Sequence, residues 1–574
     1  MNAFTITIDG RAVPVAEGES VLAAARRAGI EIPTLCYLEQ CGPLTTCLVC
    51  LVKINGRLVP SCGTKVAPGM AVESETPEVH EARRTALELL FSDHVGDCLS
   101  PCHRLCPLEL NVPVMLRAIQ AGRLDEAATE VRRALPLPAV LGRLCHHPCE
   151  QGCRRAAWDN PAAIRDMERF VADWDLGRLG PHIKDSDAPA RPEPFAGGEP
   201  RPLVSVSRDA AILPARPPHM PPRKPPSGKS VVIIGGGPAG LAAAHFLARE
   251  GHAVVVADRH ARPGGSLRAV PETELPPDVL DAELALLERL GVQFQTGVEL
   301  GRDLTLDGLM RGFDAVLLAP GELSDADAAR IGLPFRAGGI ECDPNSGQTR
   351  VPKVFAAGSA VRPVRPLVRA MAEGRAVAVA VNAFLQGRTP RRPEKPFSSV
   401  IGRLQPGELR EFLRHANAIN RVTPCDRCLG HTPREAALEA SRCLHCDCRS
   451  SGECLLQHWA QVYGADANRF RSERRVFEQR EHPGGILFEP GKCILCGICV
   501  KLAEQARELL GLTFIGRGFD VRVGVPFNEA LERGLQKVAA ECVLHCPTGA
   551  LAFANHAQAP TSAPRQPPAD QSHI

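Results

Sequence analysis

The chain has 574 residues, of which 44% are hydrophobic and 23% charged, and its formal net charge is +2. These values are ordinary for a globular protein and lack the basic excess typical of nucleic-acid binding. The longest apolar runs, such as 231–234 and 376–381, are far shorter than the roughly 20 residues that span a bilayer. The first 15 residues lack the basic and apolar regions of a signal peptide. Membrane insertion, secretion and fibrous structure are disfavoured, and we expect a cytoplasmic protein.

Cysteine is the unusual residue. The 23 cysteines are clumped, and only Cys342 stands outside five groups, which cover residues 36–62, 98–106, 145–153, 425–454 and 493–546. A reducing compartment disfavours disulfides, which are the alternative explanation. Clumping at short spacing is what thiolate ligation requires, because several sulfurs must converge on one metal centre. The pattern therefore predicts metal sites.

The first predicted domain covers residues 1–78, where alternating strands surround an Asp9-Gly10 turn and a short helix follows. It carries Cys36, Cys47, Cys50 and Cys62, with Cys41 as an additional thiol. Spacing and setting resemble the [2Fe–2S] domain that opens the large Fe–S subunit of respiratory complex I and related hydrogenases. The resemblance implies a β-grasp-like fold around a two-iron cluster, and zinc is the alternative.

Residues 79–175 form the second predicted domain, which is helical because its apolar residues recur three and four apart. Its two cysteine runs resemble the double-cluster domain of the glutamate synthase small subunit and dihydropyrimidine dehydrogenase. That resemblance implies two [4Fe–4S] clusters that exchange ligands between the runs, with ligands Cys98, Cys102, Cys106, Cys145, Cys149 and Cys153. Eight positions need two more ligands, for which Glu168 and His94 are the candidates. A single cluster is the alternative.

After a proline-rich linker over 176–228, a Rossmann-like domain is predicted over 229–390. A strand runs into Gly235-x-Gly237-x-x-Gly240 and a helix, and a second strand ends at Asp258. The glycines permit the tight turn, the approach of a pyrophosphate and close helix–strand packing. The helix N-terminus attracts the phosphates, and the carboxylate is placed to accept from a ribose hydroxyl.

This domain resembles the flavoprotein part of the glutamate synthase small-subunit family, which implies FAD. The resemblance assigns FAD contacts to Gly235, Gly237, Pro238, Ala239, Gly240, Asp258, Gly264, Gly265, Gly358 and Ser359. The family normally has Asp at the last of these positions. It also inserts a second nucleotide domain, whereas here some fifteen residues join 313–322 to 338–343, which is too short for one. NAD(P) is therefore not expected in this chain.

A connector with a Cys-rich segment is predicted over 391–480. Two C-x2-C pairs, at Cys425 and Cys443, fit a zinc ribbon. We favour a [4Fe–4S] cluster instead, because one compact set of thiols suffices for it: Cys443, Cys446, Cys448 and Cys454. This choice leaves Cys425 and Cys428 unassigned.

Residues 481–557 resemble a bacterial ferredoxin module. Cys493, Cys496 and Cys499 recur every third residue, and Cys546 precedes a proline. This pattern predicts one [4Fe–4S] cluster held by these four thiols. The site of a second cluster is lost, because Ala503 stands where its ligand would be. The tail, 558–574, is expected to be disordered.

The predicted fold class is multidomain α/β and α+β. Flavins take electrons in pairs and iron–sulfur clusters pass them singly, and no nucleophile–base pair is identifiable. We therefore predict an oxidoreductase, an Fe–S flavoprotein electron-transfer subunit of a soluble complex. Its expected partners are NAD(P)H-oxidising, hydrogenase-like or molybdopterin-type subunits, or ferredoxin. The alternatives are a self-contained FAD-dependent oxidoreductase acting on ferredoxin or a small molecule, and a zinc-binding scaffold without activity.

Overall fold

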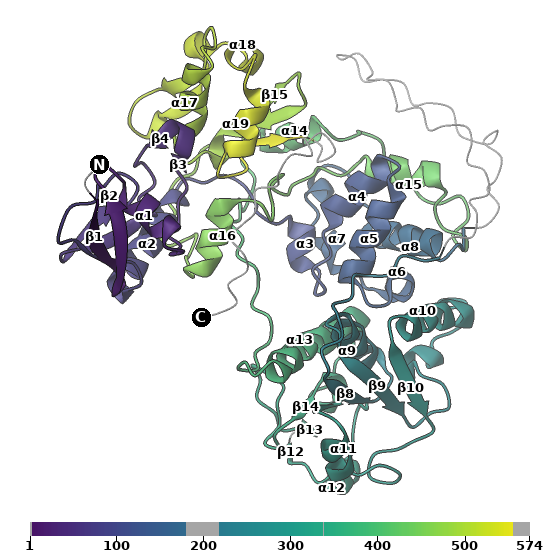
Figure 1. Ribbon diagram of the computed structural model, residues 1–574. Helices are drawn as coiled ribbons and strands as arrows, with labels where there is room; N and C mark the ends of the chain where they lie inside the picture. Colours follow the sequence, from purple (N-terminus) through teal and green to yellow (C-terminus); the bar gives the residue numbers. More distant parts are fainter. Residues whose placement is uncertain (1–2, 180–216, 337, 555–574) are drawn as a thin grey trace. The chain divides into compact units, whose positions relative to one another are not determined.

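The computed structural model describes residues 3–179, 217–336 and 338–554 (Figure 1). The chain divides into two compact units. Unit 1 comprises residues 1–100, 396–414 and 446–574, and unit 2 comprises residues 101–395 and 415–445. Unit 1 is thus discontinuous in sequence, because unit 2 interrupts it. Most of the predicted linker and the whole predicted tail lie outside the described residues.

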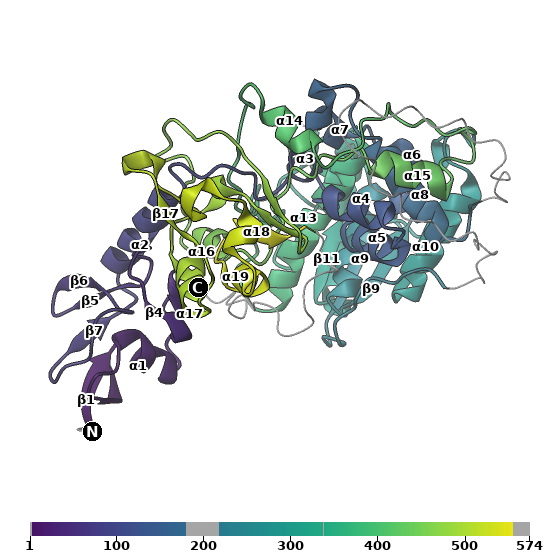
Figure 2. The same ribbon diagram turned by 90° about the horizontal axis from the view of Figure 1, so that it is seen from above.

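Unit 1 begins with a five-stranded sheet of order β2-β1-β7-β5-β6. Strands β1 (Ala3–Ile8) and β2 (Arg11–Ala16) form an antiparallel hairpin, and β1 pairs parallel with β7 (Ala71–Glu73). Strands β5 (Leu51–Ile54) and β6 (Arg57–Pro60) complete it. Figure 2 shows helix α1 (Val21–Arg27) beside these strands. Its N-cap, Ser20, accepts a hydrogen bond from the Ala23 N–H, which satisfies one of the free amides of the first turn.

The rest of unit 1 combines short strands and helices. Helix α2 (Pro77–Leu90) follows the N-terminal sheet, and strands β15 (Arg480–His482), β16 (Ile486–Phe488) and β19 (Leu551–Phe553) form a second sheet. The remaining elements are β3 (Tyr37–Leu38), β4 (Gly42–Pro43), α14 (Glu408–Leu413), α16 (Leu455–Val462), α17 (Ile498–Gln505), β17 (Thr513–Ile515), β18 (Arg522–Gly524), α18 (Leu531–Gly534) and α19 (Ala539–His545).

Unit 2 opens with a helical part that shares its core with a later helix. The helices are α3 (Pro101–Leu105), α4 (Val112–Gln120), α5 (Leu124–Ala134), α6 (Pro138–Leu144), α7 (Pro148–Gln151), α8 (Ile164–Asp175) and α15 (Pro433–Ala440). Helix α15 begins with a capping box between Thr432 and Glu435, and its Ala436 and Ala440 join the core of the earlier helices.

A parallel sheet of order β10-β9-β8-β11-β14 forms the second half of unit 2. Strands β8 (Ser230–Ile234) and β11 (Ala315–Leu318) are buried and apolar, as expected for central parallel strands. Strands β9 (Ala253–Asp258), β10 (Val292–Thr296) and β14 (Val354–Ala356) flank them, with helices α9 (Pro238–Arg249), α10 (Pro277–Arg289), α11 (Leu306–Gly312) and α13 (Leu367–Leu385). Figure 1 shows α13 lying beside α9. Gly374 permits this approach, since a Cβ there would lie 2.0 Å from the Ala239 carbonyl oxygen.

The connection from β11 to β14 is short. It contains α12 (Asp325–Ile331) and a two-stranded hairpin of β12 (Phe335–Arg336) and β13 (Gly339–Ile340). Among the described residues, the sheet around β8 is the one parallel sheet of Rossmann type. The predicted absence of NAD(P) stays a prediction.

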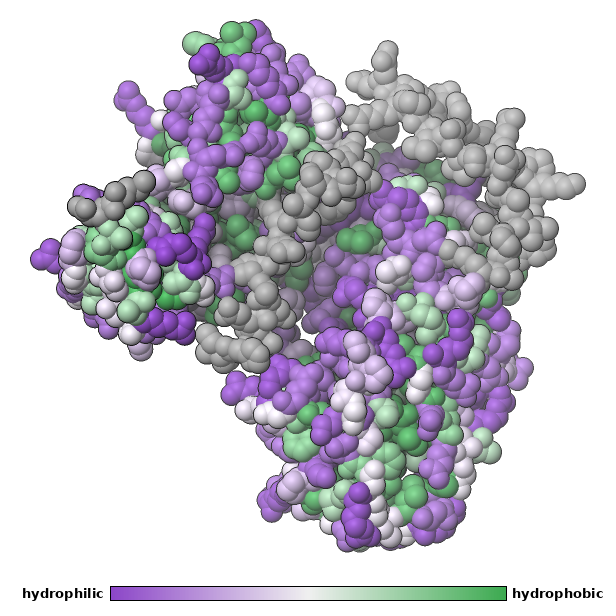
Figure 3. Space-filling view, viewed as in Figure 1, coloured by the Kyte–Doolittle hydropathy of each residue, from purple (hydrophilic) through white to green (hydrophobic). Residues whose placement is uncertain are grey.

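The surface suits the balanced composition. Figure 3 shows hydrophilic and hydrophobic residues interspersed over the visible face. Within the described ranges, no helix is both long and apolar enough to cross a membrane.

Candidate functional site

The four predicted [2Fe–2S] ligands converge in unit 1. Cys36, Cys47, Cys50 and Cys62 are buried, and the sulfurs of Cys50 and Cys62 lie 3.4 Å apart. Hydrogen bonds from Cys47 and Cys62 lower the pKa of Cys36 to about 5 and that of Cys50 to about 6. Two of the four sulfurs thus favour the thiolate form that binds iron, and this donor set fits a two-iron cluster.

The predicted ferredoxin ligands also lie together in unit 1. Burial raises the pKa of Cys493 to about 12, and burial together with neighbouring thiols raises those of Cys496 and Cys499 well above the usual range. The neighbours that raise the pKa of Cys499 include Cys546. Cys493, Cys496 and Cys499 are thus unfavourable as free thiolates, and iron would compensate their charge. The thiol of Cys542 points to the Cys499 carbonyl oxygen, 3.8 Å away.

A third group of thiols in unit 1 differs from the predicted grouping. Cys98 lies with Cys448 and Cys454, because the Cys448 N–H donates to the Cys98 carbonyl at 3.3 Å. After burial, the Cys448 thiol raises the pKa of Cys98, and Cys448 and Cys98 together raise that of Cys454. The predicted set of Cys443, Cys446, Cys448 and Cys454 is therefore divided, because Cys443 belongs to unit 2. Cys98 likewise belongs to unit 1, whereas Cys102 and Cys106, which follow it in the sequence, belong to unit 2. The cause is the insertion of unit 2 between parts of one site.

His94 lies near this third group, rather than in the helical part of unit 2. Burial lowers the pKa of its imidazole to about 3, and the nearby ammonium of Lys492 adds to the effect. Burial raises the pKa of the Cys448 thiol, and the same ammonium opposes that rise. A neutral imidazole is the form that ligates metal, so His94 fits as the fourth donor beside three sulfurs. We name this set, His94, Cys98, Cys448 and Cys454, the split site.

In unit 2 the predicted ligand Glu168 lies among thiols. Burial, and then the nearby Glu150, raise the pKa of the Glu168 carboxyl on α8 to about 8. Its negative charge raises the pKa values of the Cys106, Cys145 and Cys149 thiols, in each case after burial does. Three sulfurs and one carboxylate form a set that fits a [4Fe–4S] cluster, because the charge of Arg165 offsets only part of the effect of burial on Glu168.

We expect Glu168→Ala to lower the bound iron by about four per chain, the content of one [4Fe–4S] cluster. Glu168→Gln, which keeps an oxygen donor, should retain it. The control is Asp166→Ala on the same helix, because Asp166 pairs with Arg421 at 3.7 Å. Iron quantitation on anaerobically purified protein measures the difference. Full iron content in Glu168→Ala would exclude this residue as a ligand.

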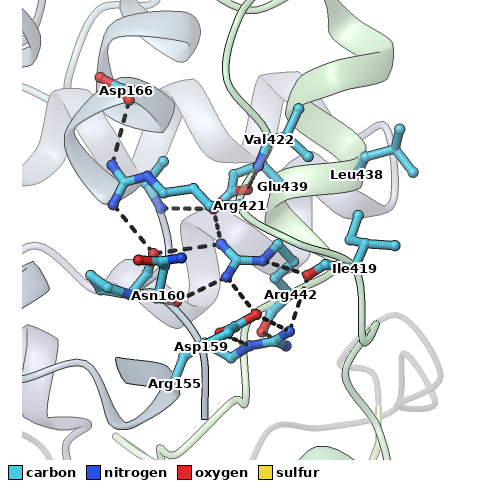
Figure 4. Close-up of polar contacts among 12 residues, drawn as sticks. Arg155, Asp159, Asn160, Asp166, Ile419, Arg421, Val422, Leu438, Glu439 and Arg442 are labelled. Atoms are coloured by element: carbon cyan, nitrogen blue, oxygen red, sulfur yellow. Dashed lines mark hydrogen bonds and ion pairs between the residues drawn. The ribbon is translucent and has the colours of Figure 1, made fainter. Parts of the chain in front are cut away.

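Cys102, Cys153 and Cys443 are further thiols at the core of unit 2. A polar network secures the segments that carry the last two (Figure 4). Arg155 donates to Asp159 and to the Arg442 carbonyl, and Arg442 donates to Asp159 at 3.0 Å. Burial alone would raise the pKa of Asp159, but hydrogen bonds from the two arginines hold it at about 2.

Cys425 and Cys428 stand apart, exposed on a turn before α15. None of the 23 cysteines forms a disulfide. Among the described residues, no three His, Cys, Asp or Glu side chains lie close enough to hold a single metal ion. Zinc at Cys425–Cys454 thus stays a prediction without a formed site.

The predicted dinucleotide residues surround a cavity of about 880 Å³ in unit 2. A Cβ at Gly235 would lie 2.2 Å from the Ala319 carbonyl oxygen, and one at Gly240 would lie 2.0 Å from that of Gly235. Gly237 has no atom within 4 Å of such a Cβ, so its backbone faces open space. The cavity is lined by Gly235, Gly237, Pro238, Ala239, Asp258, Gly265 and Ser359, among others. This cradle, open at the helix N-terminus, fits a dinucleotide diphosphate.

The other predicted residues support this cavity. The Gly264 N–H donates to the Gly236 carbonyl at 2.8 Å, and Gly358, at φ +66°, packs against Ala239. Asp258 accepts from the Gly236 N–H at 2.6 Å and from His260, so part of its carboxylate organises the loop. The cavity wall also includes Leu144, which precedes Cys145.

Comparisons with known proteins support this organisation. Family models match residues 1–77 as a 2Fe-2S iron-sulfur cluster binding domain, 78–178 as dihydropyrimidine dehydrogenase domain II, 4Fe-4S cluster, and 233–287 as an NAD(P)-binding Rossmann-like domain. They confirm the predicted fold class and the first three predicted modules.

Relatives match parts of the chain. The NADP(+)-dependent formate dehydrogenase subunit beta of Moorella thermoacetica is 38% identical over 39% of this chain and 29% of its own length. The glutamate synthase [NADPH] small chain of Escherichia coli is 29% identical over 48% of this chain and 53% of its own length. A solved NAD+-reducing [NiFe]-hydrogenase chain is 39% identical over 16% of this chain and 38% of its own, with a TM-score of 0.15. The chain thus spans about half or less of the length of these relatives.

Proposed function

We propose that the chain is an iron–sulfur flavoprotein subunit that transfers electrons within a multi-subunit oxidoreductase. The observation that carries the proposal is the contact between successive cysteine groups. Clusters must lie close together for electrons to pass between them, and a protein that only stored metal would not need its sites in series. The relatives' names, which are those of oxidoreductase subunits, support the same class of function.

Within unit 1 the contacts support an order that differs from the sequence. The ferredoxin group touches the [2Fe–2S] group: the Thr46 hydroxyl donates to the Cys496 carbonyl at 3.4 Å, and the charge of Cys36 acts on Cys496.

The ferredoxin group also touches the split site. The N–H after Cys454, on Leu455, donates to the Pro547 carbonyl at 3.0 Å, directly after the ligand Cys546. Gly549 packs so closely on the Cys448 sulfur that a Cβ there would lie 2.2 Å away. The cysteines of the ferredoxin module therefore contact both other groups of unit 1. In the proposed electron path their cluster lies between the [2Fe–2S] cluster and the split site.

In unit 2 a flavin would be next to a cluster. Leu144 lines the cavity, and the adjacent Cys145 belongs to the group around Glu168. Bound FAD would supply exchange between electron pairs and single electrons. The chain's residues bind its diphosphate at the α9 N-terminus and place its cavity beside the cysteines. FAD, rather than NAD(P), is the dinucleotide we propose for this cavity.

No residue of the chain is assigned to substrate chemistry, and we propose that this lies on a partner. Partners of the NAD(P)H-oxidising, hydrogenase-like or molybdopterin type fit a subunit with a [2Fe–2S] domain and several clusters. We also propose a cytoplasmic location, because none of the 23 cysteines forms a disulfide and thiols persist in a reducing compartment.

Anaerobic iron and flavin quantitation with EPR of the reduced protein tests the proposal. We expect one flavin and at least about 14 irons per chain, from one two-iron and three four-iron clusters. Added NADH or NADPH should leave the isolated protein oxidised. Rapid bleaching without a partner would instead favour the self-contained flavin enzyme. Colourless protein containing zinc would favour the scaffold.

A further inference from the structure

One buried charge in unit 1 has no part in the ligand sets above. Lys492 and Glu489 are each 3% exposed and form an ion pair with each other. A lysine is almost never fully buried unless it is paired, and removing it from water has a large cost. Its side chain is also fixed in place, since a Cβ at Gly96 would lie 2.6 Å from its Cε.

The backbone holds this lysine between two cysteine groups. The Val95 N–H, beside His94, donates to the Gly491 carbonyl at 2.7 Å. The Thr548 hydroxyl, two residues after Cys546, donates to the Lys492 carbonyl at 3.0 Å. Lys492 thus precedes a ferredoxin ligand, while its side chain runs over the loop that joins His94 to Cys98.

The end of the Lys492 side chain lies against the loop that carries two split-site residues. A Cβ at Gly96, between His94 and Cys98, would lie 2.6 Å from the Lys492 Cε, and the ammonium acts to lower the pKa values of His94, Cys98 and Cys448. The second carboxylate oxygen of Glu489 accepts a hydrogen bond from the Gln479 side-chain amide at 3.0 Å. A cation close to sulfur stabilises the electron-rich, reduced form of a cluster, and cluster potential follows local charge.

We propose that the buried Lys492 raises the reduction potential of a cluster at the split site. The inference rests on the proposed function, because it requires a cluster at the split site.

The test is an EPR-monitored redox titration of the full chain, with the split-site signal assigned by its loss in Cys448→Ala. Lys492→Met removes the charge with similar bulk, and it should lower the reduced-to-oxidised ratio at a fixed potential at least tenfold, which for one electron is 59 mV. Lys492→Arg should keep the ratio. Glu489→Gln should shift the ratio in the opposite direction, because it removes the opposing charge.

The matched control is Lys501→Met, which removes a lysine that pairs with Glu504 on the surface of the same module. It should leave the split-site ratio unchanged. Ratios within threefold of wild type in both Lys492→Met and Glu489→Gln would overturn the inference. Should Lys492→Met not assemble its cluster, Glu489→Gln decides alone. A wild-type protein without a split-site signal would contradict the proposed function itself, so the two failures are distinguishable.

Discussion

Cys98→Ala and Cys448→Ala should each remove the same EPR signal and about four irons per chain. The two residues are far apart in the sequence, but their backbones are joined by a hydrogen bond of 3.3 Å and their thiols share one buried group with Cys454. We therefore expect both to be donors to one cluster. Iron quantitation and EPR of the two variants, side by side, measure the effect.

Cys106→Ala is the matched control, because this thiol follows Cys98 in the same sequence run yet lies with Glu168 in unit 2. It should remove a different signal. If Cys98→Ala and Cys106→Ala removed one shared signal that Cys448→Ala left intact, the grouping by sequence run would be right and the split site wrong.

Gly237→Val should reduce the bound flavin at least tenfold while the fold and the iron content stay unchanged. A Cβ at this position meets no protein atom within 4 Å, and the residue has an ordinary φ of −82°. The protein alone therefore has room for a Cβ at this position. Only a ligand in the cavity, which Gly237 lines, would clash with the new side chain. Flavin absorbance after gel filtration measures the loss.

Gly312→Val is the control for this variant, because that glycine is equally open and lies outside the cavity wall. It should keep its flavin. Flavin content equal to wild type in Gly237→Val would show that the diphosphate binds elsewhere. A large fall in melting temperature in Gly237→Val would instead mean that the backbone at this turn is less tolerant than its geometry indicates.

Features whose interacting residues lie close together in the sequence were predictable from it. The turn at Gly235 must be glycine because Ala319 approaches it, and the strand, turn and helix that impose this lie within one short stretch. The thiols of Cys36 and Cys493 likewise lie near thiols of the same sequence run, or of the next segment of the same module. In these cases the spacing along the chain already determines which side chains meet.

The split site was not predictable in this way. Spacing indicates which thiols share a loop, and it misleads when another unit interrupts the loop, as it does between Cys98 and Cys448. The role of Lys492 was not predicted from the sequence for another reason. Lysines are expected at the surface, and nothing in its neighbours indicates burial until the Gly96 loop is seen to cover it.

The discontinuity of unit 1 also sets the order in which its predicted ligands are synthesised. Residues 101–445 are synthesised between Cys98 and Cys448, which at 5–20 residues per second takes roughly 20 to 70 s. During that interval the ribosome has already released all four N-terminal ligands, Cys36 to Cys62. The split site instead waits for Cys454, and the ferredoxin group waits for Cys546. A cluster at either of these two sites would therefore be completed late in synthesis, whereas all four N-terminal ligands are already present on the nascent chain.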